Sequence, residues 1–355
     1  ELAHEGFQVC VIEARHVGGG ATAAGMGHVV VMDDSEPQFA LTRYSQKLWD
    51  ELLRELPPEC ETLRCGTLWV AADAEEMAEV RRKNDFARRH DVPTEILDEH
   101  ALYEAEPGLR KGLAGGLLVP ADSVVFPPTV AAFLIRRAQQ KGATLRCGVP
   151  ARRLAAKRVE LADGSAVEGD LVINAAGCRS PELSPGLEVA PRKGHLVITE
   201  RYPSAVRHQL IELGYLKSAG GSANESVAFN VQPRPTGQLL IGSSRQFGDS
   251  SPDIRFDLLG RMLRRAMEYV PDLARLLALR VWTGFRAATR DKLPLIGLEP
   301  GTGVYLATGH EGLGITMSLG TARLLADSVL GRTTAIGLQP YSPARPSLRP
   351  AADGD

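Results

Sequence analysis

The sequence lacks the features that define several large classes of protein. No apolar run approaches the roughly 20 residues that a membrane-spanning helix requires, and no signal peptide is recognisable at its start. The formal net charge is −2 over 355 residues, so the composition gives no sign of a nucleic-acid partner. With 44% hydrophobic and 24% charged residues, the composition is typical of a globular protein with two domains.

Cysteine is also scarce, and its placement argues against disulfides and metal sites. The five cysteines are odd in number and scattered along the chain. Cys10, Cys147 and Cys178 lie in or beside apolar strand patterns, where we expect buried thiols. Cys60 and Cys65 have no second Cys or His pair nearby that would complete a metal site. The simplest expectation is a protein of the reducing cytoplasm that binds no metal.

What the sequence does contain is a short apolar strand followed by glycines. Residues 9–12 are expected to form a buried strand that ends in Glu13, and Gly18, Gly19 and Gly20 follow it. A carboxylate at the end of such a strand can accept hydrogen bonds from both hydroxyls of a nucleotide ribose. Glycines let the backbone approach a cofactor closely because they have no Cβ. For the strand and acid alone, an ordinary strand end with a solvated glutamate is the alternative.

Glu13 and the segment GGGATAAGMG after it resemble the flavin-binding segment of the D-amino acid oxidase and glycine oxidase family. The resemblance extends to about residue 331 and implies an FAD-dependent oxidoreductase of amines or amino acids. It assigns cofactor contacts to Glu13, Ala14, Gly19, Gly20, Ala21, Thr22, Met26, Gly27 and His28. Sarcosine oxidases attach their flavin through a cysteine near the segment 285–292, which has none here, so we expect non-covalent FAD.

One part of the family pattern is missing from this sequence. Members of the family begin with a strand and a GxGxxG turn, and the helix after that turn ends in a pattern like ELAHEG, with which this sequence starts. The turn normally presents backbone amides and a helix N-terminus to the FAD diphosphate. We therefore expect the chain as written to bind FAD weakly or not at all.

Two later segments resemble further cofactor contacts of the family. The apolar residues 171–174 run into Ala175, Ala176 and Gly177, for which a tight strand-to-helix turn is the alternative. The segment GHEGLGIT precedes a helix whose free N-terminal amides favour the negative charge of a reduced flavin, although it could serve packing alone. The resemblance assigns contacts to Ala151, Ala175, Ala176, Gly177, Gly309, His310, Glu311, Gly312, Leu313, Gly314, Ile315 and Thr316.

A third segment, WTGFR followed by DKLPLIG, indicates the substrate site. It resembles a family segment in which an arginine binds the substrate carboxylate, and Arg286 stands at that position. A guanidinium suits this role because it binds a carboxylate through two hydrogen bonds and keeps its charge. Ala287 and Lys292 depart from the family, where proline and glycine are frequent. If Arg286 is structural, Arg245 and Lys217 are the next candidates.

The order of the expected elements predicts an α/β protein with two discontinuous domains. The first is an FAD-binding Rossmann-like domain of the glutathione-reductase type, made of residues 1–62, 116–190 and 287–335. The second is a mixed, largely antiparallel α+β substrate domain, made of residues 63–115 and 191–286. Residues 273–279 are expected to be helical, and residues 336–355 to form a loosely packed tail.

These observations favour oxidation of the C–N bond of an amino acid or a cyclic secondary amine, as in D-amino acid or D-hydroxyproline dehydrogenases. The hydride would pass to flavin N5. The GHEGLGIT segment resembles subunits of D-hydroxyproline dehydrogenase and opine oxidase, which favours a quinone, an electron carrier or a partner subunit over oxygen as acceptor. A glycine or sarcosine oxidase that uses oxygen is one alternative. A non-catalytic, flavin-poor subunit of a larger complex is another.

Overall fold

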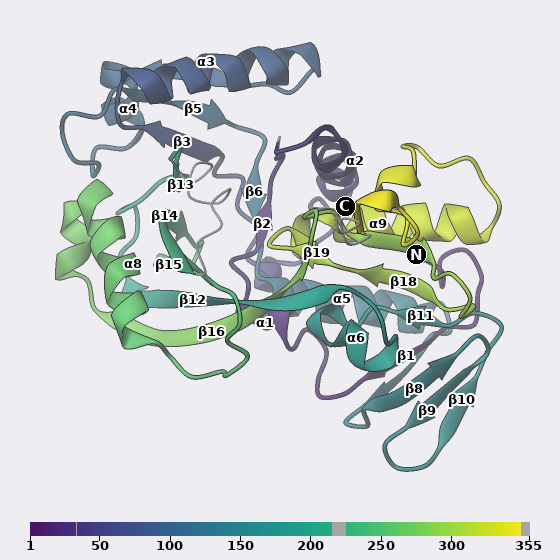
Figure 1. Ribbon diagram of the computed structural model, residues 1–355. Helices are drawn as coiled ribbons and strands as arrows, with labels where there is room; N and C mark the ends of the chain where they lie inside the picture. The colour runs from purple at the N-terminus through teal and green to yellow at the C-terminus, as the bar shows by residue number, and fades with distance from the viewer. Residues whose placement is uncertain (33, 215–224, 349–355) are drawn as a thin grey trace, which may run out of the picture.

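The computed structural model describes residues 1–32, 34–214 and 225–348, and a large mixed sheet dominates one half of it (Figure 1). The strands of this sheet follow the order β19-β16-β12-β15-β14-β13-β3-β5-β4. All neighbours are antiparallel except β3 and β13, which are parallel. The strands are β3 (Thr67–Ala71), β4 (Glu95–Asp98), β5 (Gly115–Val119), β12 (Val189–Arg201), β13 (Gln209–Glu212), β14 (Glu225–Pro233), β15 (Gln238–Gln246), β16 (Ala278–Thr289) and β19 (His310–Glu311).

Helix α8 (Phe256–Tyr269) covers one face of this sheet because its apolar residues recur one turn apart. Leu259, Met262 and Ala266 are buried and belong to the same core as Phe229 and Val231 of β14. Those two strand residues lie two positions apart, so they project to the same face of the sheet. The helix and the strand have different side-chain periods, but each places its apolar residues on one face, and these two faces pack together as one core.

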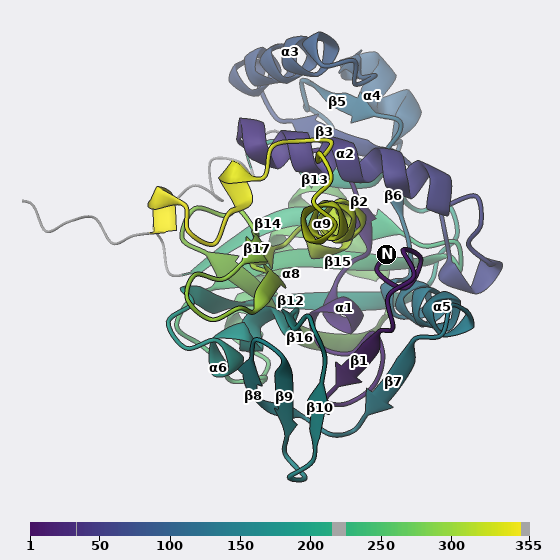
Figure 2. The ribbon, with the colours of Figure 1, turned by 90° about the vertical axis from the view of Figure 1, so that its right-hand side faces the viewer.

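The other half of the molecule consists of small sheets and two long helices. Strand β1 (Cys10–Glu13) pairs in parallel with β7 (Thr144–Cys147), and β11 (Ile173–Asn174) pairs in parallel with β18 (Tyr305–Thr308), which also pairs with β17 (Leu295–Leu298). Helices α2 (Glu36–Leu52) and α9 (Gly314–Val329) lie side by side (Figure 2). They approach closely at Gly320, where a Cβ would lie 2.3 Å from the Ser45 hydroxyl oxygen.

The remaining elements connect or extend these layers. They are α1 (Ala21–Ala24), β2 (His28–Val29), η1 (Pro58–Cys60), α3 (Ala74–Arg89), α4 (Glu99–Ala105), β6 (Ser123–Val124), α5 (Pro127–Gln140), β8 (Ala151–Ala155), β9 (Arg158–Leu161), β10 (Ala166–Glu168), η2 (Gly177–Arg179), α6 (Ser180–Leu183), η3 (Pro271–Arg275), η4 (Gln339–Tyr341) and η5 (Pro346–Leu348). Within the described ranges, no helix is both long and apolar enough to cross a membrane. The same residues include no cluster of His, Cys, Asp and Glu suited to a metal ion.

Three local expectations from the sequence were wrong. The predicted helix at residues 273–279 is a short 3-10 helix, η3, followed by the start of β16, because the β16 backbone pairs with β12 from Ala278 onward. Cys147 is exposed rather than buried, since β7 lies at the surface. The tail is packed as far as residue 348: Tyr341 is buried and its hydroxyl donates to the Pro37 carbonyl oxygen at 2.6 Å.

Candidate active site

A small polar cavity of about 80 Å³ lies where β2 and the loop before α9 face the large sheet. One wall comes from His28, Glu311, Gly312 and Leu313, with Lys292 nearby on the turn before β17. The sheet supplies the other wall, from Thr67, Trp69, Arg192, Gln209, Ile211, Asn230 and Arg245. We call this space the polar cavity. It brings together segments from almost the whole length of the chain.

Hydrogen bonds hold the two segments of the first wall together. The Thr316 hydroxyl, in the first turn of α9, donates to the His28 carbonyl oxygen at 2.8 Å and accepts from the Val30 amide at 3.3 Å. The Trp49 indole of α2 donates to the Thr316 carbonyl oxygen at 3.0 Å. Two of the segments that resemble flavin contacts are therefore joined although 288 positions separate His28 from Thr316.

Buried polar groups without a partner gather around the polar cavity. Among the described residues, neither the amide nitrogen nor the oxygen of the Gln209 side chain has a hydrogen-bond partner, nor does the Asn230 oxygen. An unsatisfied buried polar atom costs about 1–3 kcal/mol, so native proteins contain few of them. Their concentration at one cavity is what a site for a polar ligand requires.

Charges at the cavity are buried as well. Glu311 forms an ion pair with Arg192, and both side chains are largely inaccessible to solvent. Burial lowers the pKa of His28 to about 4, and a hydrogen bond with Gln232 opposes this shift only in part. Burial also lowers the pKa of His310 to about 4, and its Nε2 lies 2.8 Å from the Thr321 hydroxyl oxygen. Both imidazoles are therefore neutral at pH 7.

Arg286 lies directly beneath the loop that lines the cavity. A Cβ on Gly312 would lie 3.6 Å from the Arg286 Cδ and Nε atoms. The Arg286 Nη1 atom donates to the Ser244 carbonyl oxygen at 3.1 Å, next to the cavity residue Arg245. At Gly194 a Cβ would lie only 2.5 Å from Arg286 Nη1, so the absence of a side chain there makes room for the guanidinium.

The residues expected to bind the nucleotide half of the cofactor lie elsewhere. Glu13 ends β1, where its carboxylate accepts from the Arg15 amide at 2.9 Å and its backbone oxygen accepts from the Gly148 amide at 3.0 Å. The Thr308 hydroxyl donates to the Gly177 carbonyl oxygen at 3.0 Å, which joins the segment containing Ala175 and Ala176 to the segment that begins at Gly309. Ala151 begins β8, shortly after β7. Ala14, Gly19 and Gly20 lie in the loop between β1 and α1, and Ala21 and Thr22 are the first residues of α1.

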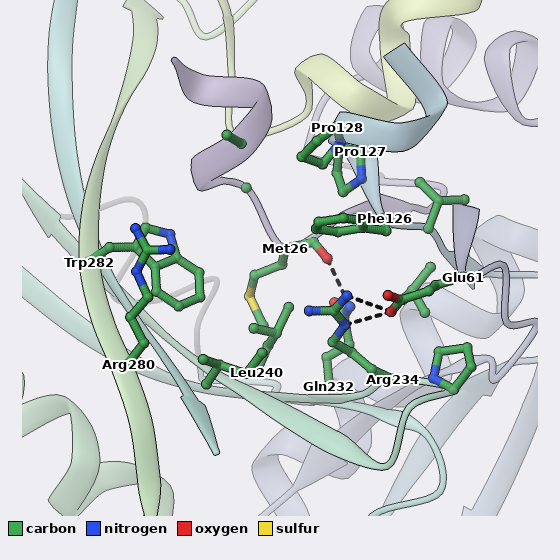
Figure 3. A pocket seen from close by; sticks show the side chains of 16 residues that line it. Met26, Glu61, Phe126, Pro127, Pro128, Gln232, Arg234, Leu240, Arg280 and Trp282 are labelled. Atoms are coloured by element: carbon green, nitrogen blue, oxygen red, sulfur yellow. Dashed lines mark hydrogen bonds and ion pairs between the residues drawn. The ribbon is translucent and has the colours of Figure 1, made fainter. Parts of the chain in front are cut away.

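A second cavity, of about 300 Å³, is lined by Met26, two positions before the polar-cavity residue His28 (Figure 3). Met26, Phe126, Leu240 and Trp282 give it largely apolar walls, so we call it the apolar cavity. Some of its polar groups are hydrogen-bonded: the Gln232 amide nitrogen donates to the Met26 carbonyl oxygen at 2.8 Å, and Arg234 Nε donates to Glu61 at 2.8 Å. The buried side-chain oxygen of Gln232 has no hydrogen-bond partner among the described residues. Gly27 has a φ of 91°, and a Cβ there would lie 1.9 Å from the Val125 carbonyl oxygen.

Comparison with known proteins identifies the family. The sequence model described as FAD dependent oxidoreductase (DAO) matches residues 1–328. The chain belongs to this FAD-dependent oxidoreductase family. Glycine oxidase from Geobacillus kaustophilus is 28% identical over 97% of this chain and 92% of its own length. D-amino acid dehydrogenase from Methylobacterium nodulans is 27% identical over 86% of this chain and 73% of its own length.

Solved structures of similar proteins support the same assignment. The crystal structure of the Geobacillus kaustophilus glycine oxidase superposes with a TM-score of 0.87 and 26% identity, covering 97% of this chain and 94% of that chain. L-proline dehydrogenase from P. horikoshii has the same fold, with a TM-score of 0.84 and 22% identity, covering 96% of this chain and 92% of that chain. The predicted fold class, a Rossmann-like FAD-binding part with a mixed substrate part, is confirmed, whereas the domain boundaries stay predictions.

The described residues fit the flavin that this family uses. Helix α9 begins at Gly314 with no capping side chain, so its first amides are available to an electronegative group. Gly312, just before this helix, leaves the adjoining backbone accessible. Together with the unpartnered amides of Gln209 and Asn230, these groups form a polar surface that a ligand would satisfy.

Several cavity residues could not be assigned from the sequence. Arg192, Gln209 and Asn230 lie on the successive strands β12, β13 and β14, and only the order of these strands in the sheet brings the three side chains to one cavity. The sequence contains a partial signal for this wall. Gln209 and Ile211 are two positions apart in one strand, so their side chains project to the same face of the sheet. Lys217, an alternative carboxylate anchor, lies outside the described residues.

Proposed function

We propose that this protein oxidises the C–N bond of an amino acid or a cyclic secondary amine, with the substrate carboxylate bound by Arg286. The observation that carries the proposal is the polar cavity. There, segments that resemble the flavin-binding segments of the family face basic side chains of the large sheet and the unpartnered side-chain atoms of Gln209 and Asn230. Bound FAD would supply the redox chemistry by accepting a hydride from the carbon that bears the nitrogen. The imine product would then hydrolyse off the enzyme.

Each residue has a limited task in this scheme. Arg286 lies opposite Arg192 in the pairing of β16 with β12, so the two side chains share the face of the sheet that carries the cavity. Its guanidinium would fix the substrate carboxylate, while the neutral His28 and the amides of Gln209 and Asn230 would orient the amine. A strong base is not required when the amine binds in its deprotonated form.

For the cofactor, we propose two separate groups of contacts. Glu13 would hold the adenosine ribose, with Ala14, Gly19, Gly20, Ala21, Thr22, Ala151, Ala175, Ala176 and Gly177 along the nucleotide. Met26, Gly27, His28 and the segment Gly309, His310, Glu311, Gly312, Leu313, Gly314, Ile315 and Thr316 would surround the flavin. The cavities support this division, since Met26 lines the apolar cavity and His28, Glu311, Gly312 and Leu313 line the polar cavity, whereas no residue of the first group lines either.

Anaerobic flavin reduction tests the proposal. The FAD-loaded protein is mixed with D-proline, D-alanine, sarcosine or glycine, and the flavin absorption is followed. We expect at least one of these substrates to bleach the flavin, whereas the corresponding amines without a carboxylate should react poorly. A flavin-loaded protein that no amino acid or amine reduces would contradict the proposal and favour a non-catalytic subunit.

A glycine oxidase that uses oxygen is the second candidate, because glycine oxidases are among the relatives by sequence and by structure. The two candidates differ in the electron acceptor. Peroxide formed in air with glycine would indicate the oxidase, whereas dye or quinone reduction with D-proline and no peroxide would indicate a dehydrogenase.

A further inference from the structure

The pairing of β12 with β15 is irregular beside Arg286. Lys193 and Val197 of β12 both have Cα partners in β15, but the register shifts between them. Such irregularities leave backbone polar groups out of the ladder and are frequent next to active sites. Gly194 lies in this interval, and a Cβ there would lie 2.5 Å from Arg286 Nη1. The irregular stretch therefore belongs to the surroundings of the Arg286 guanidinium.

Ser244 of β15 makes hydrogen bonds of its own across this irregular stretch. Its carbonyl oxygen accepts from Arg286 Nη1 at 3.1 Å. Its hydroxyl oxygen accepts from the His195 backbone amide at 2.9 Å and lies 2.9 Å from His195 Nδ1. Ser244 and His195 are both completely buried, so solvent does not reach the contacts between them. Ser244 thus joins the Arg286 guanidinium to the His195 imidazole.

The second ring nitrogen of His195 determines which tautomer the imidazole adopts. His195 Nε2 lies 3.0 Å from the Arg255 backbone nitrogen, whose N–H group can only donate. Nε2 is therefore the nitrogen without a hydrogen, and neutral His195 carries its hydrogen on Nδ1, which donates to the Ser244 hydroxyl oxygen. Burial lowers the pKa of His195 and the charges of Lys193 and Arg255 lower it further, so the imidazole is neutral at pH 7.

We propose that His195 is a positioning residue for the recognition of the substrate carboxylate. Through Nδ1 it holds Ser244, and through the Ser244 carbonyl oxygen it sets the orientation of the Arg286 guanidinium. This contact uses one of the five N–H groups of the guanidinium, and bidentate binding of a carboxylate depends on the plane in which the group is held. The inference rests on the proposed function, in which Arg286 binds the substrate carboxylate.

His195 also has a second contact, which is purely structural. Through Nε2 and the Arg255 amide, it ties the segment between β15 and α8 to β12. Thr283, the Cα partner of His195 in β16, ties down the same segment, because its hydroxyl donates to the Pro252 carbonyl oxygen at 2.7 Å. Thr283 therefore shares the structural role of His195, and the Nδ1 contact with Ser244 distinguishes His195 from it.

Two substitutions of His195 separate the roles of its ring nitrogens. An asparagine amide is as far from the backbone as Nδ1, so His195→Asn keeps a donor for Ser244 and loses the acceptor for the Arg255 amide. A glutamine amide reaches the position of Nε2, so His195→Gln keeps that acceptor and loses the donor for Ser244.

Steady-state kinetics at saturating FAD measure the effect, with whichever of D-proline, D-alanine, sarcosine and glycine reduces the flavin fastest. We expect His195→Gln to raise KM about fivefold, the effect of one hydrogen bond, and to change kcat by less than about twofold. His195→Asn should restore KM to within about twofold of the native value, because the donor to Ser244 is kept.

Two further variants make the test specific. Ser244→Ala removes the same contact from its other side and should raise KM by about the same factor, and combining it with His195→Gln should add little because the two residues act as a pair. Thr283→Val is the matched control: it removes a hydrogen bond to the same segment, and KM should stay native. For the amine that lacks the carboxylate, kcat/KM should be native in each of these variants, as should the FAD affinity in a flavin titration.

Three results would overturn the inference: an equal rise of KM in His195→Asn and His195→Gln, a native KM in Ser244→Ala, or an equal loss of kcat/KM for the amine. Each of them leaves the proposed function standing as long as the native enzyme prefers the amino acid to the amine. A native enzyme that oxidises both equally well would instead count against carboxylate binding by Arg286, and so against the proposed function.

Discussion

The polar and apolar cavities are both lined by residues of one short segment, yet their chemistry differs. Met26 and His28 are two positions apart and line different cavities. In the apolar cavity, ion pairs and hydrogen bonds satisfy the polar groups of Arg234, Glu61 and Trp282, whose indole donates to the Ala24 carbonyl oxygen at 3.3 Å. In the polar cavity, the Gln209 and Asn230 side chains keep unpartnered buried atoms.

The difference is one of number. Gln232 supplies one unpartnered buried oxygen at the apolar cavity, whereas Thr67, Gln209 and Asn230 supply several such atoms at the polar cavity, which favours the polar cavity as the ligand site. A protein that is only marginally stable cannot carry many unsatisfied groups without an advantage elsewhere. A buried acid, Asp122, is hydrogen-bonded to Val31, whose neighbours Val30 and Met32 line the polar cavity. Asp122 accepts from the Gln46 amide at 3.0 Å and from the Val31 backbone amide at 3.3 Å, and burial raises its pKa to about 7.

The largest effect is expected from Arg286, on the polar side. Arg286→Ala should lower kcat/KM for a carboxylate substrate, by an amount equivalent to a loss of about 2–5 kcal/mol of transition-state stabilisation, because a buried carboxylate loses its partner. Arg286→Lys should mainly raise KM, since the ammonium keeps the charge and loses the planar fork. Both effects are measured as kcat and KM in steady-state kinetics with an amino acid and with the amine that lacks its carboxylate.

The amine serves as the control for Arg286. Lacking the carboxylate, it should be a poor substrate of the native enzyme and should lose little more in Arg286→Ala. FAD affinity should be nearly native in both variants. If both substrates lose equally, Arg286 is structural and Arg245 or Lys217 becomes the candidate anchor.

The next effect concerns the pH dependence of stability. Asp122 has a pKa of about 7 in the folded protein, against 3.8 for an ordinary solvated aspartate, so the native state binds more protons than the unfolded state between these two pH values. Stability should therefore fall as the pH rises from 4 to 7. Asp122→Asn keeps the acceptor oxygen and removes this dependence, so its Tm at pH 8 should exceed that of the native protein by about 2–6 °C.

Thermal unfolding at pH 5 and pH 8 measures the Asp122 effect. The difference between variant and native protein should shrink or change sign at pH 5. A constant difference at both pH values would mean that Asp122 is ionised throughout, and the contrast between the cavities would lose one of its supports.

A smaller effect is expected at the far end of the cofactor. Glu13→Gln keeps the shape but weakens two charge-assisted hydrogen bonds, each worth about 1.5–3 kcal/mol, so FAD affinity should fall at least about tenfold. Kinetic constants at saturating FAD should be native, because Glu13 lines neither cavity. Unchanged affinity in a flavin titration would remove Glu13 from the cofactor site.

The smallest effect is expected on the apolar side. Trp282→Phe removes one hydrogen bond and should cost about 0.5–1.5 kcal/mol of unfolding free energy in a urea titration. The ratio of kcat/KM between amino acid and amine should stay native, in contrast to Arg286→Ala. A large change in that ratio would show that the apolar cavity also handles the substrate carboxylate.

Much of the fold could be predicted from local patterns. The apolar strand expected at residues 9–12 corresponds to β1, and the helix expected after the GHEGLGIT segment is α9. The prediction of a helix at residues 273–279 was wrong because pairing with β12 determines the backbone conformation from Ala278 onward. The prediction of a loosely packed tail was wrong for Tyr341 and Arg345, because both side chains donate hydrogen bonds to backbone oxygens of distant residues. No local sequence pattern reveals such contacts.

By itself, the sequence determined the family, the cofactor and the glycine-rich segments, because these depend on residues that are neighbours along the chain. Only the tertiary structure decided which side chains share a cavity. Thr67, Gln209 and Asn230 come from strands that pair across the large sheet, and the Thr316 hydroxyl joins α9 to β2. The physical reason is that cavity walls are formed by contacts across strands and between layers. Residues that meet in such contacts are separated along the chain, and the pattern of a single sequence does not show which of them will meet.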